Sequence, residues 1–522
     1  NGDGYDDVII GACNAYYGGS KRGIAYVIFG GRAFTTLLMF GAALASNGDG
    51  FRMTGANMGA VSNAGDVNGD GLDDVIVGSM YGDPDPGRVN AGVVYVVFGR
   101  ATPSDVDLLN LYANTVGFCI FGNADNSHLG ASVSRAGDFN QDGYDDIYVC
   151  VFGKDLMHRS KNLLFINQRN LTFKEEAEAY GLADAGYSTQ AAFFDYDRDG
   201  DLDMFLVNYL LSTKNSNTIF PRDKSGFSPA NDKLYRNDGD SINAGHPVFT
   251  DVSMVAGIKE DGYGLGVSVS DFNNDGWPDV YVANDFISND ELWLNNRNGS
   301  FTNCIDKAIQ HQSYSSMGSD AADINNDALT DIITLDMLPE TNERKKTSLS
   351  FMNYDRYESE RRMGYEPEFM RNMLQLNNGN LNSGTTGIPF FSEIGRLSGI
   401  HATDWSWSVL LADFNNDGWK DIHVTNGIGR DFIDADFLEF SNGIFNSNQT
   451  REEQQKAIRK KLASLENVNL PNYLYINNKD LTFSDQSEAG GVNEPSMSNG
   501  AAYADLDNDG DLDLVVNNIN KP

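Results

Sequence analysis

Aspartate, asparagine and glycine recur in this sequence in a nine-residue pattern, D-x-(N/D)-x-D-G-x-x-D, which places oxygen-bearing side chains at alternate positions. Oxygen-only ligands on a tight loop suit a hard cation, and Ca²⁺ takes about 6–8 oxygens. The pattern therefore predicts a series of calcium-binding loops. Complete copies run over 66–74, 138–146, 195–203, 271–279, 323–331, 413–421 and 505–513, and residues 1–7 form a copy that lacks its first two positions.

The predicted ligands are the side chains at positions one, three, five and nine and the backbone carbonyl at position seven. A glycine at position six allows the sharp turn that brings both ends of the loop onto one ion. We expect several Ca²⁺ ions, up to eight. The predicted metal ligands are Asn1, Asp3, Asp7, Asp66, Asn68, Asp70, Leu72, Asp74, Asp138, Asn140, Asp142, Tyr144, Asp146, Asp195, Asp197, Asp199, Asp201, Asp203, Asp271, Asn273, Asp275, Trp277, Asp279, Asp323, Asn325, Asp327, Leu329, Asp331, Asp413, Asn415, Asp417, Trp419, Asp421, Asp505, Asp507, Asp509, Asp511 and Asp513.

One copy departs from the pattern, because Ala328 replaces the glycine at position six. We expect that loop to be strained and its ion to be bound more weakly. Two other interpretations were weighed for the loops. An EF-hand shares the first five positions, but it ends with an acidic residue at position twelve and is flanked by helices. Simple Asp-Gly surface turns explain a single copy but not the repetition.

Short runs of β-branched and aromatic residues flank each loop, such as Gly266–Ser270 before and Val280–Val282 after one copy. The loop therefore joins two strands of a hairpin. From about residue 162, a couplet of the form L-x-x-N…F, as in Leu164–Asn167 with Phe173, predicts a second hairpin in each repeat. Four strands per repeat predict an all-β fold, a single β-propeller over residues 1–522 with seven blades, and eight as the alternative.

The net charge of −36 excludes nucleic acid as a partner and disfavours an anionic membrane surface. The longest apolar stretch is far shorter than a membrane-spanning helix needs, so we expect no membrane insertion. Cys13, Cys119, Cys150 and Cys304 are too widely spaced for a zinc site and too few for a disulfide framework. Since the chain opens inside a motif, we expect it to be a fragment of a longer protein.

These repeats resemble the FG-GAP and VCBS repeat proteins, which include the integrin α-chain propeller and the cartilage-acidic-protein group. Residues 1 to about 150 resemble the integrin type, with Tyr26–Gly30 echoed by Tyr95–Gly99. Residues from about 162 resemble the bacterial cartilage-acidic-protein type. The resemblance implies an extracellular, cell-surface or periplasmic calcium-binding module that serves adhesion or recognises a protein or glycan ligand. It implies no catalysis by the loops.

A calcium-dependent polysaccharide lyase or hydrolase is the alternative function. Against it, the six histidines are scattered among different repeats and no catalytic motif is present. His423 lies in a strand-like run and is interpreted as a strand residue. Trp405 and Trp407 could form a sugar-stacking platform, although such aromatics more often pack between sheets. We therefore predict a non-enzymatic module.

Three long insertions, residues 209–232, 337–371 and 428–470, each follow a second strand and precede a third. In a four-stranded meander this connection lies on the face opposite the metal loops, so we expect the insertions to form one cap. The last of them carries a helix signature, with Thr450 and Glu453 as a capping box. Because long loops on rigid scaffolds commonly carry function, this cap is the predicted partner surface.

Overall fold

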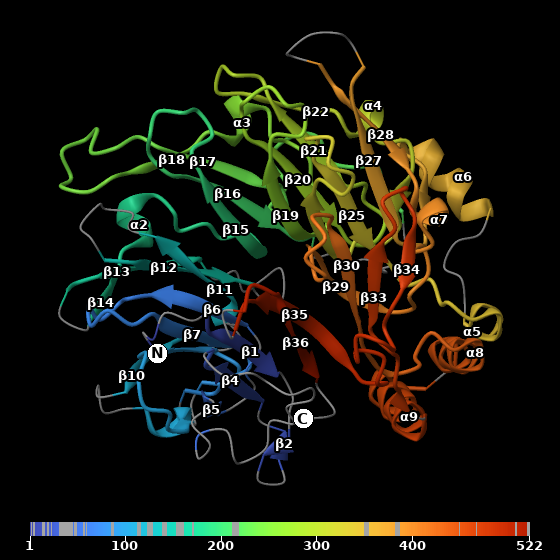
Figure 1. Cartoon of the computed structure of the whole chain (residues 1–522), viewed down its shortest axis with the longest axis horizontal. Coiled ribbons are helices and arrows are strands. Elements are labelled where there is room, and N and C mark those ends of the chain that lie inside the picture. Colours follow the sequence, from blue (N-terminus) through green and yellow to red (C-terminus); the bar gives the residue numbers. More distant parts are fainter. Residues whose placement is uncertain are drawn as a thin grey trace.

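A computed structural model describes the chain apart from residues 2, 4–5, 13–15, 18–19, 22, 31–44, 46–49, 56–57, 59, 85–87, 112–115, 123–128, 138–143, 153–160, 170–171, 211–218, 349–353, 382–386, 448, 466, 507–508 and 519–522. The described residues form an all-β fold of four-stranded sheets with few helices, as the sequence predicts. Figure 1 shows these sheets placed side by side around a common centre, toward which their first strands point. This arrangement is consistent with a propeller.

The first two sheets contain the amino-terminal strands. They are antiparallel except for the β5–β9 pair. In sheet order their strands are β1 (Val8–Ala12), β4 (Ile24–Ile28), β5 (Gly50–Thr54) and β9 (Val106–Asp107), then β6 (Val61–Gly65), β7 (Asp74–Ser79), β8 (Val93–Val97) and β10 (Gly117–Phe121), with the ribbon β2 (Tyr16–Tyr17) and β3 (Ser20–Lys21) and the 3-10 turn η1 (Leu108–Asn110) beside them.

Five further four-stranded sheets follow, and each is antiparallel throughout. A two-stranded sheet ends the chain. Their strands are β11 (Leu129–Gly137), β12 (Asp146–Val151), β13 (Leu163–Asn167), β14 (Phe173–Glu175); β15 (Ser188–Phe194), β16 (Asp203–Asn208), β17 (Lys233–Asn237), β18 (Phe249–Asp251); β19 (Gly264–Ser270), β20 (Asp279–Asn284), β21 (Glu291–Asn295), β22 (Phe301–Asn303); β24 (Gly318–Ala322), β25 (Asp331–Leu335), β27 (Met373–Asn380), β28 (Pro389–Glu393); β29 (Ser406–Ala412), β30 (Asp421–Asn426), β33 (Tyr473–Asn477), β34 (Phe483–Asp485); and β35 (Ser498–Ala504) with β36 (Asp513–Asn518).

Strand composition follows the position of each strand in its sheet. Second strands such as β16 and β20 are buried along their whole length, and each is an apolar run between a first aspartate and a last asparagine. First strands are rich in small residues, because neighbouring backbones approach closely there. A Cβ added to Gly318 in β24 would lie only 2.0 Å from the carbonyl oxygen of Trp407 in β29. The small residues therefore allow the sheets to converge.

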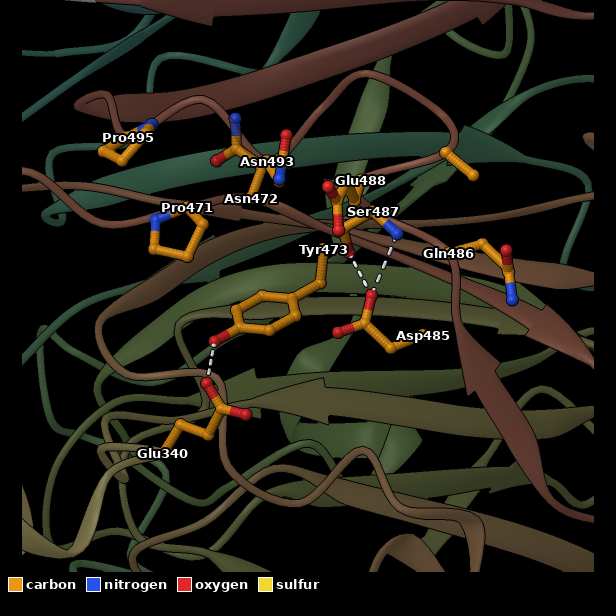
Figure 2. A pocket seen from close by; sticks show the side chains of 11 residues that line it. Glu340, Pro471, Asn472, Tyr473, Asp485, Gln486, Ser487, Glu488, Asn493 and Pro495 are labelled. Carbon is orange, nitrogen blue, oxygen red and sulfur yellow. Dashed lines mark hydrogen bonds between the residues drawn. The ribbon is translucent and has the colours of Figure 1, made fainter.

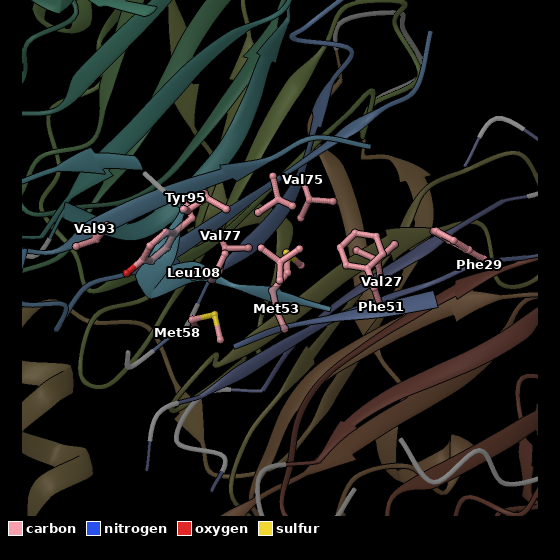
Figure 3. Close-up of a cluster of buried hydrophobic side chains, with 14 residues drawn as sticks. Val27, Phe29, Phe51, Met53, Met58, Val75, Val77, Val93, Tyr95 and Leu108 are labelled. Atoms are coloured by element: carbon pink, nitrogen blue, oxygen red, sulfur yellow. The ribbon is translucent and has the colours of Figure 1, made fainter. Parts of the chain in front are cut away.

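The hydrophobic core lies between consecutive sheets rather than inside one sheet. Figure 3 shows one such layer, in which Phe51 and Met53 of β5 pack with Val75 and Val77 of β7. Similar layers join the later sheets pairwise along the chain. Burying these apolar faces stabilises the fold by about 25 cal/mol per Å². Each sheet is thus held mainly by its two neighbours.

The last sheet also packs against the first. Leu506 and Val515 beside β35 and β36 belong to the same hydrophobic cluster as Val8 and Ile10 of β1. The side-chain amide of Asn517 donates a hydrogen bond to the carbonyl of Gly11. The two ends of the described chain are therefore joined by side-chain packing, while β36 and β1 belong to separate sheets.

One-turn helices follow the fourth strands of several sheets, a feature that the sequence analysis did not predict. Three of them end at a glycine with positive φ, a residue that adopts this conformation without strain. The one-turn helices, with or without such a glycine, are α2 (Ala177–Tyr180), α3 (Ser253–Ala256), α4 (Ile305–Ala308) and α7 (Gly395–Ser398).

Longer helices and short ribbons occupy the insertions. The predicted capping box is confirmed: the Thr450 hydroxyl accepts a hydrogen bond from the backbone N–H of Glu453, whose carboxylate accepts one from the N–H of Thr450. No helix in the described part of the chain is long and apolar enough to cross a membrane. The insertion elements are α5 (Asn342–Thr347), α6 (Tyr354–Met363), β26 (Glu368–Phe369), α8 (Ala435–Phe445), α9 (Arg451–Ser464), and β31 (Ile428–Arg430) paired with β32 (Asn467–Val468). β26 pairs with β23 (Gln312–Ser313), which precedes β24 and lies outside the insertions.

Candidate metal loops and binding cavities

In six loops the aspartate at position nine is buried and is the first residue of the following strand; Asp513 also begins its strand but is half-buried, and Asp7 lies just before β1. The six are Asp74, Asp146, Asp203, Asp279, Asp331 and Asp421. In the loop 66–74, one carboxylate oxygen of Asp74 accepts from the backbone N–H of Val67 at 3.0 Å, and the other accepts from Gly99 at 2.7 Å. The carboxylate thus ties the start of its own loop to the end of the third strand. The same pair of bonds is made by Asp203, Asp279, Asp331 and Asp421.

The aspartate at position one is surrounded by the backbone of its own loop. Asp271 accepts hydrogen bonds from the N–H groups of Asp275 at 2.8 Å and Gly276 at 2.6 Å. Equivalent bonds form at Asp66, Asp195, Asp323, Asp413 and Asp505. The loops therefore share one backbone conformation, in which N–H groups of the loop surround the position-one carboxylate.

Positions three and five meet through their side chains. The amide of Asn273 donates to Asp275 at 2.9 Å, and Asn325 donates to Asp327 at the same distance. Positions three and five are thus linked by their side chains, while the position-one carboxylate accepts the backbone N–H groups of positions five and six. The predicted ligands Asp138, Asn140, Asp142 and Asp507 lie outside the described residues.

The loops 195–203 and 505–513 are the most acidic, with aspartate at all five alternate positions. Ligand oxygens of Asp195, Asp197 and Asp203 lie within 4.8 Å of one another. One oxygen each of Asp197 and Asp201 is buried without a hydrogen-bond partner. Oxygen donors left unpaired among like charges fit a hard divalent cation such as Ca²⁺.

The raised pKa values of the buried aspartates are also consistent with a site for a cation. Burial raises the pKa of Asp203 to about 8, against the lowering effect of its two backbone N–H donors, and the charges of Asp197 and Asp201 raise it further. Burial likewise raises the pKa of Asp279 and of Asp331 to about 7. A bound cation would favour the ionised form of each carboxylate. The residues that would hold it are those at positions one, three, five and nine.

Ala328 has a positive φ of 66°, in the position where other loops have glycines with φ between 84° and 98°. The backbone conformation is the one that the pattern requires, although alanine adopts it only with strain. Cβ atoms built on the equivalent Gly418 and Gly510 would meet nothing within 4 Å. The replacement of glycine by Ala328 therefore strains the backbone and does not create a steric clash.

Two loops receive a positive side chain from the turn between their third and fourth strands. Arg297 lies 2.8 Å from a carboxylate oxygen of Asp275, and Lys479 lies 3.2 Å from one of Asp417. Each cation meets the aspartate at position five. These two loops thus carry less uncompensated negative charge than the loop 195–203.

The asparagine that ends the third strand in the L-x-x-N couplet has a role that the sequence analysis missed. The side chain of Asn295 donates to the carbonyl of Tyr196, at position two of the preceding sheet's loop, at 2.8 Å. It also donates to Pro278 in its own loop at 3.2 Å. The sequence feature that could have indicated this role is the recurrence of asparagine at the last position of the L-x-x-N couplet. Asn167, Asn377 and Asn477 make the same inter-sheet bond.

The residues considered for catalysis have structural surroundings. His423 in β30 is fully buried, and burial lowers its pKa to about 4. Trp405 is buried with Ile428 and Leu470, and its ring centroid lies 5.0 Å from that of Phe432. The indole N–H of Trp407 donates to the carbonyl of Gly427 at 2.6 Å. Both tryptophans pack the third insertion against its sheet.

A cavity of about 600 Å³ lies beside β33 and β34, at the ends away from the metal loops. Figure 2 shows the Tyr473 hydroxyl donating to Glu340, at 2.7 Å, and Asp485 accepting from Ser487. The lining combines these groups with Pro471, Pro495 and amide side chains. Its central polar groups are already paired within the chain.

A second cavity of about 390 Å³ occupies the corresponding place beside β17 and β18. Asn231 lines it, and both polar atoms of its amide are buried without a hydrogen-bond partner. Phe227 and Met254, which also line it, are 81% and 41% exposed. This cavity therefore combines an unpaired amide with exposed apolar side chains.

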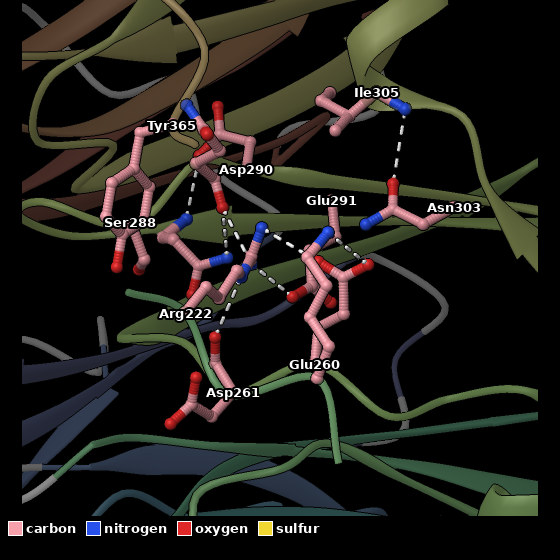
Figure 4. Close-up of polar contacts among 12 residues, drawn as sticks. Arg222, Glu260, Asp261, Ser288, Asp290, Glu291, Asn303, Ile305 and Tyr365 are labelled. Atoms are coloured by element: carbon pink, nitrogen blue, oxygen red, sulfur yellow. Dashed lines mark hydrogen bonds and ion pairs between the residues drawn. The ribbon is translucent and has the colours of Figure 1, made fainter. Parts of the chain in front are cut away.

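The insertions contact the sheets and also contact one another. Arg222 is buried and contacts Glu260 at 3.2 Å, the Glu291 carboxylate, and the carbonyl of Asp261 at 3.0 Å (Figure 4). The Tyr365 hydroxyl donates to the carbonyl of Phe220 at 2.8 Å, which joins the second insertion to the first. Arg344 of the second insertion pairs with Asp431 of the third.

The fold and these loops define a class: an all-β repeat protein with an acidic loop between the first two strands of its sheets. The comparisons with known proteins agree. Residues 58–97 match the FG-GAP repeat, and residues 131–206, 271–334 and 462–516 match the FG-GAP-like repeat. The chain thus contains FG-GAP and FG-GAP-like repeats.

Integrin alpha-V from Gallus gallus is similar to part of this chain, with 28% identity over 211 residues. The similar region covers 38% of this chain and 19% of the integrin chain. The predicted resemblance to FG-GAP proteins and to the integrin α-chain is confirmed.

Proposed function

We propose that this chain is a calcium-binding β-propeller that acts as an extracellular or cell-surface recognition module for a protein ligand. The observation that carries the proposal is the loop conformation that recurs from repeat to repeat, together with the convergence of Asp195, Asp197 and Asp203 in one of these loops. Ion binding would offset their mutual repulsion, so the fold is expected to depend on Ca²⁺. Similarity to an integrin α-chain supports the recognition role and the location.

Thermal unfolding in millimolar Ca²⁺ and in excess EDTA tests the calcium part. A site filled at about 100 times its Kd adds roughly 2.7 kcal/mol, so several sites together raise Tm strongly. Mg²⁺ at the same concentration is the matched control, since Mg²⁺ demands a smaller octahedral site. Equal Tm values in Ca²⁺ and EDTA would contradict the proposal.

We propose that the eight sheets are eight blades of one propeller over residues 1–522. The sequence favoured seven blades, with eight as the alternative. The packing of Leu506 and Val515 against Val8 and Ile10 supports eight, because the first and last sheets are neighbours with separate strand pairings.

We also propose that insertions 209–232, 337–371 and 428–470 form the recognition face, opposite the metal loops. Each follows the end of a second strand, whereas each metal loop precedes the start of one. The contacts of Tyr365 with Phe220 and of Arg344 with Asp431 support a common cap.

The proposed role is non-enzymatic. Buried His423 and the packed tryptophans support it, since these are the residues that a catalytic or sugar-stacking role would need exposed.

A further inference from the structure

Asn231 and Asn289 occupy the same place in two neighbouring repeats. Asn208 ends β16, and its side chain donates to the carbonyl of Asn231 at 2.8 Å, while its N–H donates to Asp232 at 2.8 Å. In the next repeat, Asn284 ends β20 and donates in the same way to Asn289, at 2.9 Å, and to Asp290, at 2.8 Å. The two asparagines are therefore equivalent in backbone position, and they are 3% and 4% exposed.

The amide of Asn289 is occupied by an extended segment of the second insertion. Its oxygen accepts from the backbone N–H of Glu366 at 2.8 Å, and its nitrogen donates to the carbonyl of the same residue at 3.3 Å. The nitrogen also donates to the Glu368 carboxylate at 2.6 Å. One asparagine thus binds both backbone groups of a single residue just before β26.

Among the residues that the structure describes, the amide of Asn231 has no such partner. Both its nitrogen and its oxygen are buried and unpaired, which costs free energy in the folded chain unless a ligand supplies the missing bonds. The cavity that it lines has a volume of about 390 Å³, large enough for a short peptide segment. The donor and acceptor of the amide match the C=O and N–H of one peptide residue.

The remaining lining indicates which peptide fits. Lys233 lies 2.5 Å from Asp184 and 3.4 Å from Asp251, and the third carboxylate of the lining, that of Asp232, accepts the N–H of Asn208. Phe227 and Met254 expose apolar surface at the same cavity. A ligand with an apolar side chain next to the bound residue would cover this surface.

We propose that this cavity binds an extended peptide segment of a partner protein, with Asn231 binding the backbone N–H and C=O of one residue and Phe227 covering a neighbouring apolar side chain. This proposal specifies the class of partner, an extended peptide, and it rests on the proposed recognition function. It is separate from the calcium loops, so the two proposals fail in different experiments.

A phage library that displays random peptides, selected on the full chain in Ca²⁺, tests the proposal. The enriched peptides are then synthesised, and their affinities for the unmodified chain and for its variants are measured by fluorescence anisotropy. We expect Asn231→Leu and Phe227→Ala to weaken binding by at least about tenfold through the lost backbone bonds and apolar contact. Val255→Ala, at an 86% exposed residue that does not line the cavity, is the control and leaves affinity unchanged.

Stability measurements separate recognition from a structural role. Asn231→Leu is expected to keep or raise Tm, because it removes an unpaired buried amide, whereas Asn289→Leu lowers Tm by leaving the backbone groups of Glu366 unpaired. N-methylation of the bound peptide residue should abolish binding. Peptides that bind Asn231→Leu as tightly as the unmodified chain, a library without enriched peptides, or neutral oligosaccharides that bind in a manner dependent on Asn231 would each overturn the proposal.

Discussion

The first two sheets and the five four-stranded sheets that follow hold their loops with the same aspartate but differ in its partner. Asp7 and Asp74 accept from the backbone of a glycine, Gly30 or Gly99. In the later sheets an asparagine takes that place, as Asn295 does opposite Asp279. Its side chain adds hydrogen bonds that glycine has no atoms to make.

The difference shows that two sets of hydrogen bonds hold the loops, and that the first set forms without the second. The position-nine aspartate closes a loop onto its own sheet in both regions. The asparagine additionally joins a loop to the loop of the preceding sheet. The change falls between Gly99 and Asn167, and it follows the division of the chain into FG-GAP and FG-GAP-like repeats.

Removing one asparagine should have the largest effect on this comparison. Asn477→Leu is expected to destabilise the chain by about 2–4 kcal/mol, because the buried carbonyl of Ile324 and the part-buried carbonyl of Lys420 both lose their side-chain donor. Urea denaturation measures the change. The control Asn478→Ala removes an exposed neighbour, and equal midpoints for the two variants would show that the inter-sheet bond contributes nothing.

A change at the equivalent glycine tests the amino-terminal region. A Cβ on Gly99 would lie 2.5 Å from the carbonyl oxygen of Asp73 and 2.9 Å from Leu72 Cβ. Gly99→Ala should therefore cost about 1–3 kcal/mol through displacement of the loop. Gly443→Ala in α8, where a Cβ meets nothing within 4 Å, is the matched control. A neutral Gly99→Ala would mean that the tight fit is not what selects glycine in this region.

Sequence patterns predicted the loop hairpins because every loop residue involved is local. They also predicted the α9 capping box, whose two partners are three residues apart. The role of Asn295 was not predictable in this way, since its partner Tyr196 lies 99 residues earlier in another repeat. The cavity at Asn231 was missed for the same reason: its amide is informative only beside that of Asn289, whose partner comes from a distant insertion.

Ala328→Gly tests whether backbone strain at position six weakens ion binding in one loop of the later sheets. Removing the strain of a non-glycine residue at φ 66° should favour the ion-binding conformation by about 1 kcal/mol, or roughly fivefold in Ca²⁺ affinity at that loop. Calorimetric titration of both proteins measures it. Gly418→Ala, the reverse change in the next loop, should weaken binding by a similar factor. Identical titrations for all three proteins would show that the strain is irrelevant to the ion.

The smallest expected effect concerns the built-in cations. Lys479→Gln removes a half-exposed ammonium from beside Asp417, and should tighten Ca²⁺ binding in that loop about twofold at low salt and less at high salt. Lys456→Gln in α9 provides a charge-matched control far from the loops in sequence. Weaker binding in Lys479→Gln than in this control would mean that the lysine supports the site rather than competing with the ion.

The most direct test of the calcium loops is an anomalous difference map from crystals of the full chain grown in Ca²⁺. We expect peaks inside the acidic loops, with the strongest at Asp195, Asp197 and Asp203, whose oxygens converge. Peaks are also expected in the loops of Asp271 and Asp413, in both cases on the side of the position-nine aspartate. A well-resolved map with no peak in any of these loops would contradict the central claim that calcium holds them.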